Sequence, residues 1–155
     1  MSLTKPQEQF CYEITRKIYD HPLSMLFLEP VNTSIFTDYL GIVKQPMDLG
    51  TILTKLDRKE YRDITQWKSD IMQIWKNAKV YNPPDTYAFK IAEIMEQKSE
   101  RLMQEMPKDE IDLWQIRMTR AAKKLQKYLS NIPAIPQVNH QKPAVSGPPK
   151  QHIKR

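Results

Sequence analysis

The apolar positions of this chain fall into five stretches with spacings of three and four residues, which is the pattern of amphipathic helices. In the first stretch, Phe10, Ile14 and Ile18 recur every four positions. Prolines separate the stretches, and Asp48, Asp63 and Asp85 are placed to cap the helices that follow them. The predicted helices span residues 6–19, 48–56, 63–81, 85–106 and 108–130.

The connection between the first two helices, residues 22–45, has no sustained period. It is nevertheless rich in apolar residues from Met25 to Leu40, so we expect it to pack against the helices. No stretch alternates apolar and polar residues for long enough to predict a strand. The pattern therefore predicts an all-α fold, a helical bundle with one long first crossover loop and an extra C-terminal helix.

Composition limits the class of protein further. The 155 residues are 40% apolar and 27% charged, which predicts one soluble globular domain with a tail. No apolar run approaches the ~20 residues that span a bilayer, and residues 1–10 lack the apolar segment of a secretory signal. Cys11 is the single cysteine and cannot form an internal disulfide, which favours a reducing compartment. We expect it to be buried as a small apolar residue.

The formal charge of +6 is divided unevenly along the chain. Residues 1–107 carry a net charge of −1, and residues 108–155 carry +7. From residue 132 onward the chain has five prolines and no acidic residue, which predicts a flexible, basic, Pro-rich tail over residues 132–155. This division favours a ligand-reading domain followed by a basic appendage.

One short segment, Tyr81–Thr86, stands out as a candidate binding feature. Pro83 and Pro84 cannot continue the helix before them, so that helix should end at about Tyr81 with Asn82 at the corner. An asparagine side chain can act there as both donor and acceptor. A polar amide held at a rigid helix end among aromatic residues is suited to reading a ligand.

The sequence offers little for catalysis or metal binding. His21, His140 and His152 are far apart, and no Cys/His spacing predicts a zinc site. No nucleophile–base pair and no Gly-rich phosphate loop can be argued. We therefore expect neither an enzyme nor a cofactor nor a metal.

Several of these motifs together resemble a bromodomain, the acetyl-lysine reader of chromatin proteins. They are Asp38-Tyr39, the run Val43–Ile52 with its Pro-Met-Asp-Leu segment, and the corner Tyr81–Asp85, in the family's order. The resemblance covers residues 6–107 and leaves an additional amphipathic helix over 108–131. It implies a left-handed, up-down four-helix bundle. The pocket would lie between the first long loop and the loop after the third helix.

The resemblance also implies roles for individual side chains. Asn82 would donate its amide to the acetyl carbonyl, and Tyr39 would reach the same oxygen through an ordered water. The family's Trp-Pro-Phe shelf reads Met25-Leu26-Phe27 here, which removes the flat indole at the entrance. The implied acetyl-lysine-binding residues are Asn82, Tyr39, Tyr81, Val31, Phe27, Ala88, Leu26 and Met25.

Several of these residues also have a purely structural interpretation. Asn82 alone could be an ordinary turn residue, and Tyr81 could belong to the core. The residues that could merely anchor the loop are Val31, Phe27 and Leu26. Trp67 and Trp75 lie on a helical stripe and are expected in the core rather than on a binding surface. Ile35 and Phe36 are left open between pocket and loop core.

Each face of the fifth predicted helix, the apolar and the basic one, has two interpretations. Its apolar stripe is expected to pack back on the bundle, with a partner helix as the alternative. Its basic residues could contact nucleic-acid phosphates or form a solvated charged face. The candidate nucleic-acid contacts are Arg117, Arg120, Lys123, Lys124 and Lys127.

The expected function is binding of acetylated lysine on histone tails or other nuclear proteins. Such a reader would recruit its parent protein, as part of a larger chromatin complex in the nucleus. The alternative is a nucleic-acid-binding or scaffold module that acts through the basic C-terminal region. The Pro83-Pro84 pair is similar to the second bromodomain of bromodomain–extraterminal proteins, but two prolines do not set a subfamily.

Overall fold

The structure is a computed structural model that describes residues 3–104, 106–107 and 109–133. Within these residues every regular element is helical, and none is long and apolar enough to cross a membrane. The prediction of an all-α fold with an extra C-terminal helix is confirmed. The elements are α1 (Lys5–Tyr19), the 3₁₀ helix η1 (Pro22–Phe27), α2 (Tyr39–Ile42), α3 (Leu49–Asp57), α4 (Ile64–Tyr81), α5 (Tyr87–Met103) and α6 (Glu110–Ser130).

The helix starts follow from local capping chemistry. The Asp48 carboxylate accepts the Thr51 N–H at 2.8 Å and caps α3, and Asp63 caps α4 in the same way. The prediction that Asp85 caps the next helix is wrong, because Thr86 occupies that position. Asp85 lies inside a turn that the Thr86 N–H closes on the Pro83 carbonyl at 3.0 Å, so the cap comes one residue later.

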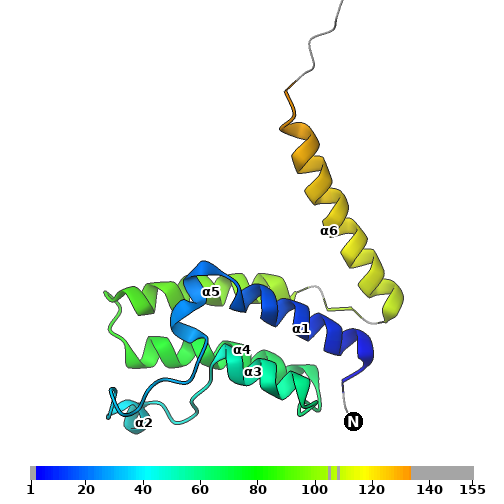
Figure 1. The fold of residues 1–155 in the computed structure, drawn as a ribbon. Coiled ribbons are helices and arrows are strands. Elements are labelled where there is room, and N and C mark those ends of the chain that lie inside the picture. Colours follow the sequence, from blue (N-terminus) through cyan, green and yellow to red (C-terminus); the bar gives the residue numbers. More distant parts are fainter. Residues whose placement is uncertain (1–2, 105, 108, 134–155) are drawn as a thin grey trace, which may run out of the picture.

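Four of the helices form the bundle, with α4 packed along α5 and α1 along α3 (Figure 1). Trp67 and Trp75 are fully buried in its core, as predicted. Their indole N–H groups donate to Thr15 Oγ1 at 3.0 Å and Ser99 Oγ at 3.1 Å. These two bonds tie α4 to α1 and to α5 inside the core, where an unpaired N–H would be costly.

Cys11 lies in the same core and is fully buried, as predicted. Burial raises the pKa of its thiol to about 12. Because the thiolate is the reactive form, we expect a disulfide reagent in mildly alkaline buffer to label the folded chain on the order of a hundredfold more slowly than the chain in guanidinium. Equal labelling rates in the two solutions would contradict the burial of this residue.

The long connection from α1 to α3, residues 20–48, crosses the end of the bundle where α4 joins α5 (Figure 1). Its base packs on the core as expected, through Phe27, Leu28 and Met47. Two hydrogen bonds to the backbone of the loop hold the loop in place. The Gly50 N–H donates to the Leu28 carbonyl at 2.9 Å, and the buried Asn77 amide donates to the Gln45 carbonyl at 2.7 Å.

The close approach at Gly50 leads to a stability prediction. A Cβ at this position would lie 2.7 Å from the Leu28 carbonyl oxygen, which is too close for any real contact. We expect Gly50→Ala to push the loop away from α3 and to lower the free energy of unfolding by about 1–3 kcal/mol.

Gly41→Ala is the matched control, because a Cβ there has no atom within 4 Å. Chemical denaturation of both variants measures the effect. A Gly50→Ala variant as stable as Gly41→Ala would show that the loop does not depend on this contact.

The prediction that the last helix, α6, packs back along the bundle is wrong. It leaves the bundle and projects away from it (Figure 1), and Leu113 is its one buried residue. The residues after the first turns of α6 are exposed, because α6 contacts α1 only near its own start. The predicted tail lies outside the described residues, apart from residues 132–133.

Candidate functional site

A cavity of about 190 Å³ opens at the end of the bundle, between the long loop and the corner that joins α4 to α5. Its walls come from segments far apart in the sequence, which the bundle brings together. The lining residues are Leu26, Phe27, Glu29, Val31, Phe36, Tyr39, Met47, Asp48, Ile74, Ala78, Tyr81, Asn82 and Ala88.

Asn82 is the residue that ends α4, in extended backbone geometry, as the prolines after it predict. Its backbone N–H and its side-chain Nδ2 both donate to the Ala78 carbonyl, at 3.0 and 2.8 Å. An amide nitrogen has two N–H groups, and the bond to Ala78 uses one of them. The contact with Ala78 therefore orients the amide in the cavity wall.

An aromatic cluster forms the wall beside this amide. The Tyr39 and Tyr81 rings meet edge to face with centroids 4.9 Å apart, and Phe36 meets Tyr81 at 6.2 Å. The Tyr81 hydroxyl donates to Asp38 Oδ1 at 2.8 Å, which ties the end of α4 to the loop. These contacts hold the loop against the end of α4 beside the cavity.

Both tyrosine hydroxyls stay protonated at neutral pH. Burial, and then the negative charge of Asp48, raise the pKa of Tyr39 above its ordinary value. The hydrogen bond to Asp38 raises the pKa of Tyr81. The wall therefore presents uncharged hydroxyls.

Phe27 supports the floor, since its ring packs edge to face on the buried Trp75 with centroids 5.1 Å apart. Ala78 lies one turn and Ile74 two turns before Asn82 on the same face of α4. The floor is thus continuous with the hydrophobic core, and this gives it a fixed shape.

Seven of the eight predicted binding residues line this cavity, and Met25 does not. Met25 is 74% exposed. The reason is the three-residue period of η1. That period puts Ser24, buried and bonded to the Ile18 carbonyl at 2.5 Å, on the same side as Phe27 and turns Met25 outward.

Sequence reasoning left out part of the lining. Phe36 belongs to it, while Ile35, left open with it, is exposed. Ile74 and Ala78 could have been found from their spacing to Asn82 on one helix face. Glu29 lies in a loop without a period, so no local signal indicated it, and the same loop left Phe36 open between pocket and loop core.

The charged groups at the cavity differ in their environment. Asp48 is 4% exposed and already bonds the Thr51 N–H and hydroxyl, so it acts as a helix cap. Glu29 is exposed at the margin. Among the described residues, no three His, Cys, Asp or Glu side chains gather in a way that could hold a metal ion.

A comparison with known families matches residues 11–94 to the family model described as Bromodomain. The chain belongs to the bromodomain family. A bromodomain is a module that reads acetyl-lysine, and the cavity lies where the family resemblance placed the pocket, between the long loop and the corner at Asn82.

The relatives of this bromodomain are diverse. The chain is 37% identical over 97 residues to "Nucleosome-remodeling factor subunit NURF301-like" of Caenorhabditis elegans, covering 63% of this chain and 4% of that protein. It is 34% identical over 85 residues to "SWR1 complex bromodomain subunit bdf1" of Schizosaccharomyces pombe, covering 52% of this chain and 15% of that protein. It is 34% identical over 87 residues to "Bromodomain-containing protein 9" of Homo sapiens, covering 56% and 15%. The names of these relatives do not indicate one common subfamily.

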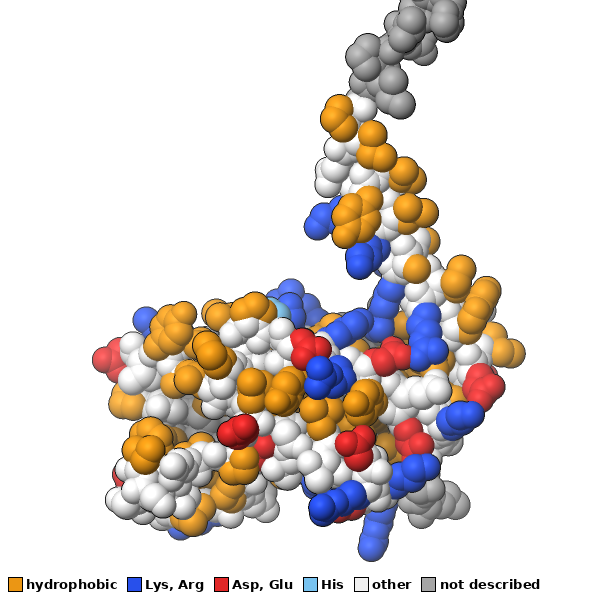
Figure 2. Space-filling model, viewed as in Figure 1, with side chains coloured by type: hydrophobic (Ala, Val, Ile, Leu, Met, Phe, Trp, Pro, Cys, Tyr) orange, Lys and Arg blue, Asp and Glu red, His pale blue; other side chains and the backbone are white. Residues whose placement is uncertain are grey.

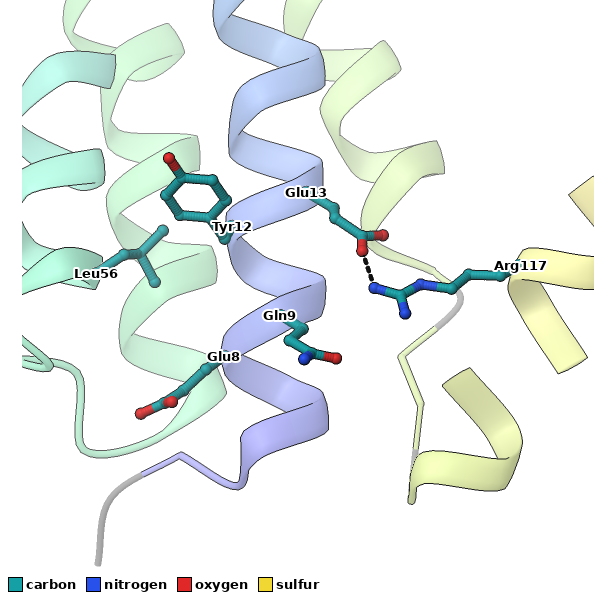
Figure 3. A pocket seen from close by; sticks show the side chains of 6 residues that line it. All are labelled: Glu8, Gln9, Tyr12, Glu13, Leu56 and Arg117. Carbon is teal, nitrogen blue, oxygen red and sulfur yellow. Dashed lines mark hydrogen bonds and ion pairs between the residues drawn. The ribbon is translucent and has the colours of Figure 1, made fainter. Parts of the chain in front are cut away.

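The basic residues predicted as nucleic-acid contacts all lie on α6, outside the bromodomain bundle. Arg117 forms an ion pair with Glu13 of α1 (Figure 3). This pair lies at a shallow hollow of about 310 Å³, lined by Glu8, Gln9, Tyr12, Glu13, Leu56 and Arg117. Arg120 is half-buried, while Lys123, Lys124 and Lys127 are exposed. Arg117 is exposed as well, so four of the five basic residues are exposed, and one of these four already has an ion-pair partner.

Proposed function

We propose that this bromodomain binds acetylated lysine on histone tails or other nuclear proteins. It would bring its parent protein, within a larger chromatin complex in the nucleus, to acetylated chromatin. The observation that carries the proposal is the Asn82 amide, held by the Ala78 carbonyl in the wall of an apolar cavity. We place the reader domain at residues 6–107, followed by the amphipathic helix 108–131 and the tail 132–155.

The chemistry of the cavity suits a neutral amide. Acetylation removes the charge of a lysine side chain. Its acetyl oxygen can accept the second N–H of Asn82, and its methyl group can contact Phe27 and Val31. An unmodified lysine would bring a strongly hydrated ammonium into the same apolar space, which is costly without a charge partner.

The remaining wall residues have supporting roles in this proposal. The Tyr39 hydroxyl, kept neutral by burial, would reach the acetyl oxygen through an ordered water. Tyr81 would close the wall while its hydroxyl stays on Asp38. Leu26 and Ala88 would border the entrance, where the small Ala88 leaves space.

Carboxylates near the mouth favour a basic peptide. Glu29 lines the cavity at an exposed position, and the Asp38 carboxylate lies beside Tyr81. Sequences rich in Lys and Arg, such as histone tails, would be attracted to this region. The attraction should be moderate and sensitive to salt, because both groups face solvent.

An array of acetylated and matched unmodified peptides from histone tails and other nuclear proteins tests the proposal. Binding to a subset of the acetylated spots, with little binding to their unmodified counterparts, supports it. Equal binding to both forms would show that basic charge, not acetylation, is recognised.

A second candidate function is nucleic-acid binding through α6, favoured by its exposed Lys123, Lys124 and Lys127. Such binding would weaken steeply as the salt concentration rises. Replacing the three lysines with Ala should lower the affinity for duplex DNA and leave acetyl-peptide binding unchanged. Unchanged DNA affinity would rule out this role for the three side chains.

A further inference from the structure

The exposed apolar residues of α6 form a regular seam. They alternate in spacing between three and four residues over residues 111–128, which is the a/d pattern of a coiled coil rather than the wider face of a helix packed on a bundle. We call these six residues the α6 seam. They are Ile111, Trp114, Met118, Ala121, Leu125 and Tyr128.

The α6 seam has no partner within the described residues. Ile111 is 68% exposed and Tyr128 is 61% exposed, although both are large apolar side chains. Figure 2 shows apolar side chains along the outer edge of α6 and basic ones on the side towards the bundle. A row of this kind is unusual for a surface that meets only water.

The bundle does not compete for the α6 seam. The helix is attached through Leu113, which is 4% exposed, and through the ion pair of Arg117 with Glu13 (Figure 3). Leu113 lies roughly a third of a turn away from the seam, at 3.6 residues per turn. The attachment therefore fixes the first turns of α6 and leaves the seam facing outward.

The charges beside the α6 seam indicate what covers it. One border carries Glu110, Arg117 and Lys124 at the g positions of the heptad, the e positions on the other border are uncharged, and every charged residue of α6 from Arg117 to Lys127 is basic. We propose that the α6 seam docks an acidic amphipathic helix of another protein as a two-stranded coiled coil. Glu or Asp on that helix would lie beside Lys124, since Arg117 already pairs with Glu13, and its apolar residues would fill the seam.

Two other occupants fit the charges less well. A second copy would bring together two α6 helices that each carry more basic than acidic residues, so their net positive charges would repel one another. The tail of this chain, residues 134–155, has no acidic residue to offer. An acidic partner helix alone satisfies both the apolar and the charged part of the surface.

The test uses two designed heptad peptides of four repeats with Leu at the a and d positions. One carries Glu at the e and g positions, and the other carries Lys there. Fluorescence anisotropy with the full chain measures both affinities. We expect the Glu peptide to bind at least about tenfold more tightly than the Lys peptide, with Lys124→Glu reducing this preference.

A pair of double variants locates the site. Met118→Asp with Leu125→Asp places two charges in the α6 seam and should weaken the Glu peptide at least about tenfold. Thr119→Asp with Gln126→Asp adds the same charges at exposed positions off the seam and should bind nearly as the parent does. Circular dichroism should show equal helix content in both.

Three results would overturn the proposal. The first is that neither peptide binds, and the second is that both bind equally well. The third is that sedimentation velocity shows the chain to self-associate and Met118→Asp with Leu125→Asp to abolish this, because the occupant is then a second copy.

Discussion

Trp67→Ala should lower the free energy of unfolding by about 3–5 kcal/mol, which is among the largest effects expected of a single substitution in this chain. The side chain is fully buried between α1 and α4, and its ring meets Phe10 edge to face at 6.4 Å. Its removal leaves a large cavity in the core and takes away the hydrogen-bond donor to Thr15. Denaturant titration followed by circular dichroism measures the loss.

Trp114→Ala is the matched control, because this tryptophan on α6 is 61% exposed and should cost little. A milder variant keeps the test usable if Trp67→Ala does not fold. Thr15→Val keeps the shape of the side chain and leaves the Trp67 indole N–H unpaired, so it should cost about 1–3 kcal/mol. Equal stabilities of Trp67→Ala and Trp114→Ala would contradict the position of Trp67 in the core.

Asn82→Ala should weaken the binding of an acetylated peptide by about 1–3 kcal/mol, which is roughly 5- to 150-fold in affinity. The substitution removes the amide that faces the cavity and leaves the apolar walls in place. It also removes the side-chain bond to the Ala78 carbonyl, but the backbone N–H of residue 82 still donates there at 3.0 Å. The end of α4 should therefore survive.

Asn131→Ala is the control for this substitution. Asn131 ends α6 through its backbone and is exposed, far along the chain from the cavity. Both variants should show cooperative thermal unfolding close to that of the parent, and calorimetric titration gives the affinities. Equal affinities of the two variants would remove Asn82 from the binding site.

Local signals in the sequence were sufficient for much of the fold. The end of α4 follows from Pro83, because proline constrains the residue before it, and the start of α3 follows from the Asp48 cap. Both effects act within a few residues. The buried Trp67 and Trp75 follow from the spacing of apolar residues on one helix face.

The errors arose where geometry depends on more than spacing along the chain. Met25 was expected in the site, but the three-residue period of η1 turns it away from the cavity. Thr86 caps α5 in place of Asp85, because the turn after the prolines takes one residue more. The apolar stripe of α6 was read correctly as a stripe, yet a stripe does not say which surface it meets.

The candidate site shows the same division. The motif residues Tyr39, Tyr81 and Asn82 were identified through the family resemblance, and the structure brings them together in one wall. Phe36 and Glu29 line the cavity because of the conformation of the loop, which the sequence pattern does not determine. The roles of these side chains in ligand binding remain predictions.

The most direct test of acetyl-lysine reading is a calorimetric titration of the full chain with one histone-tail peptide in acetylated and unmodified forms. We predict that the acetylated form binds at least about tenfold more tightly than the unmodified form, and that Asn82→Ala reduces this difference while Asn131→Ala keeps it. If the parent chain binds both forms with the same affinity, the cavity at Asn82 does not read acetyl-lysine.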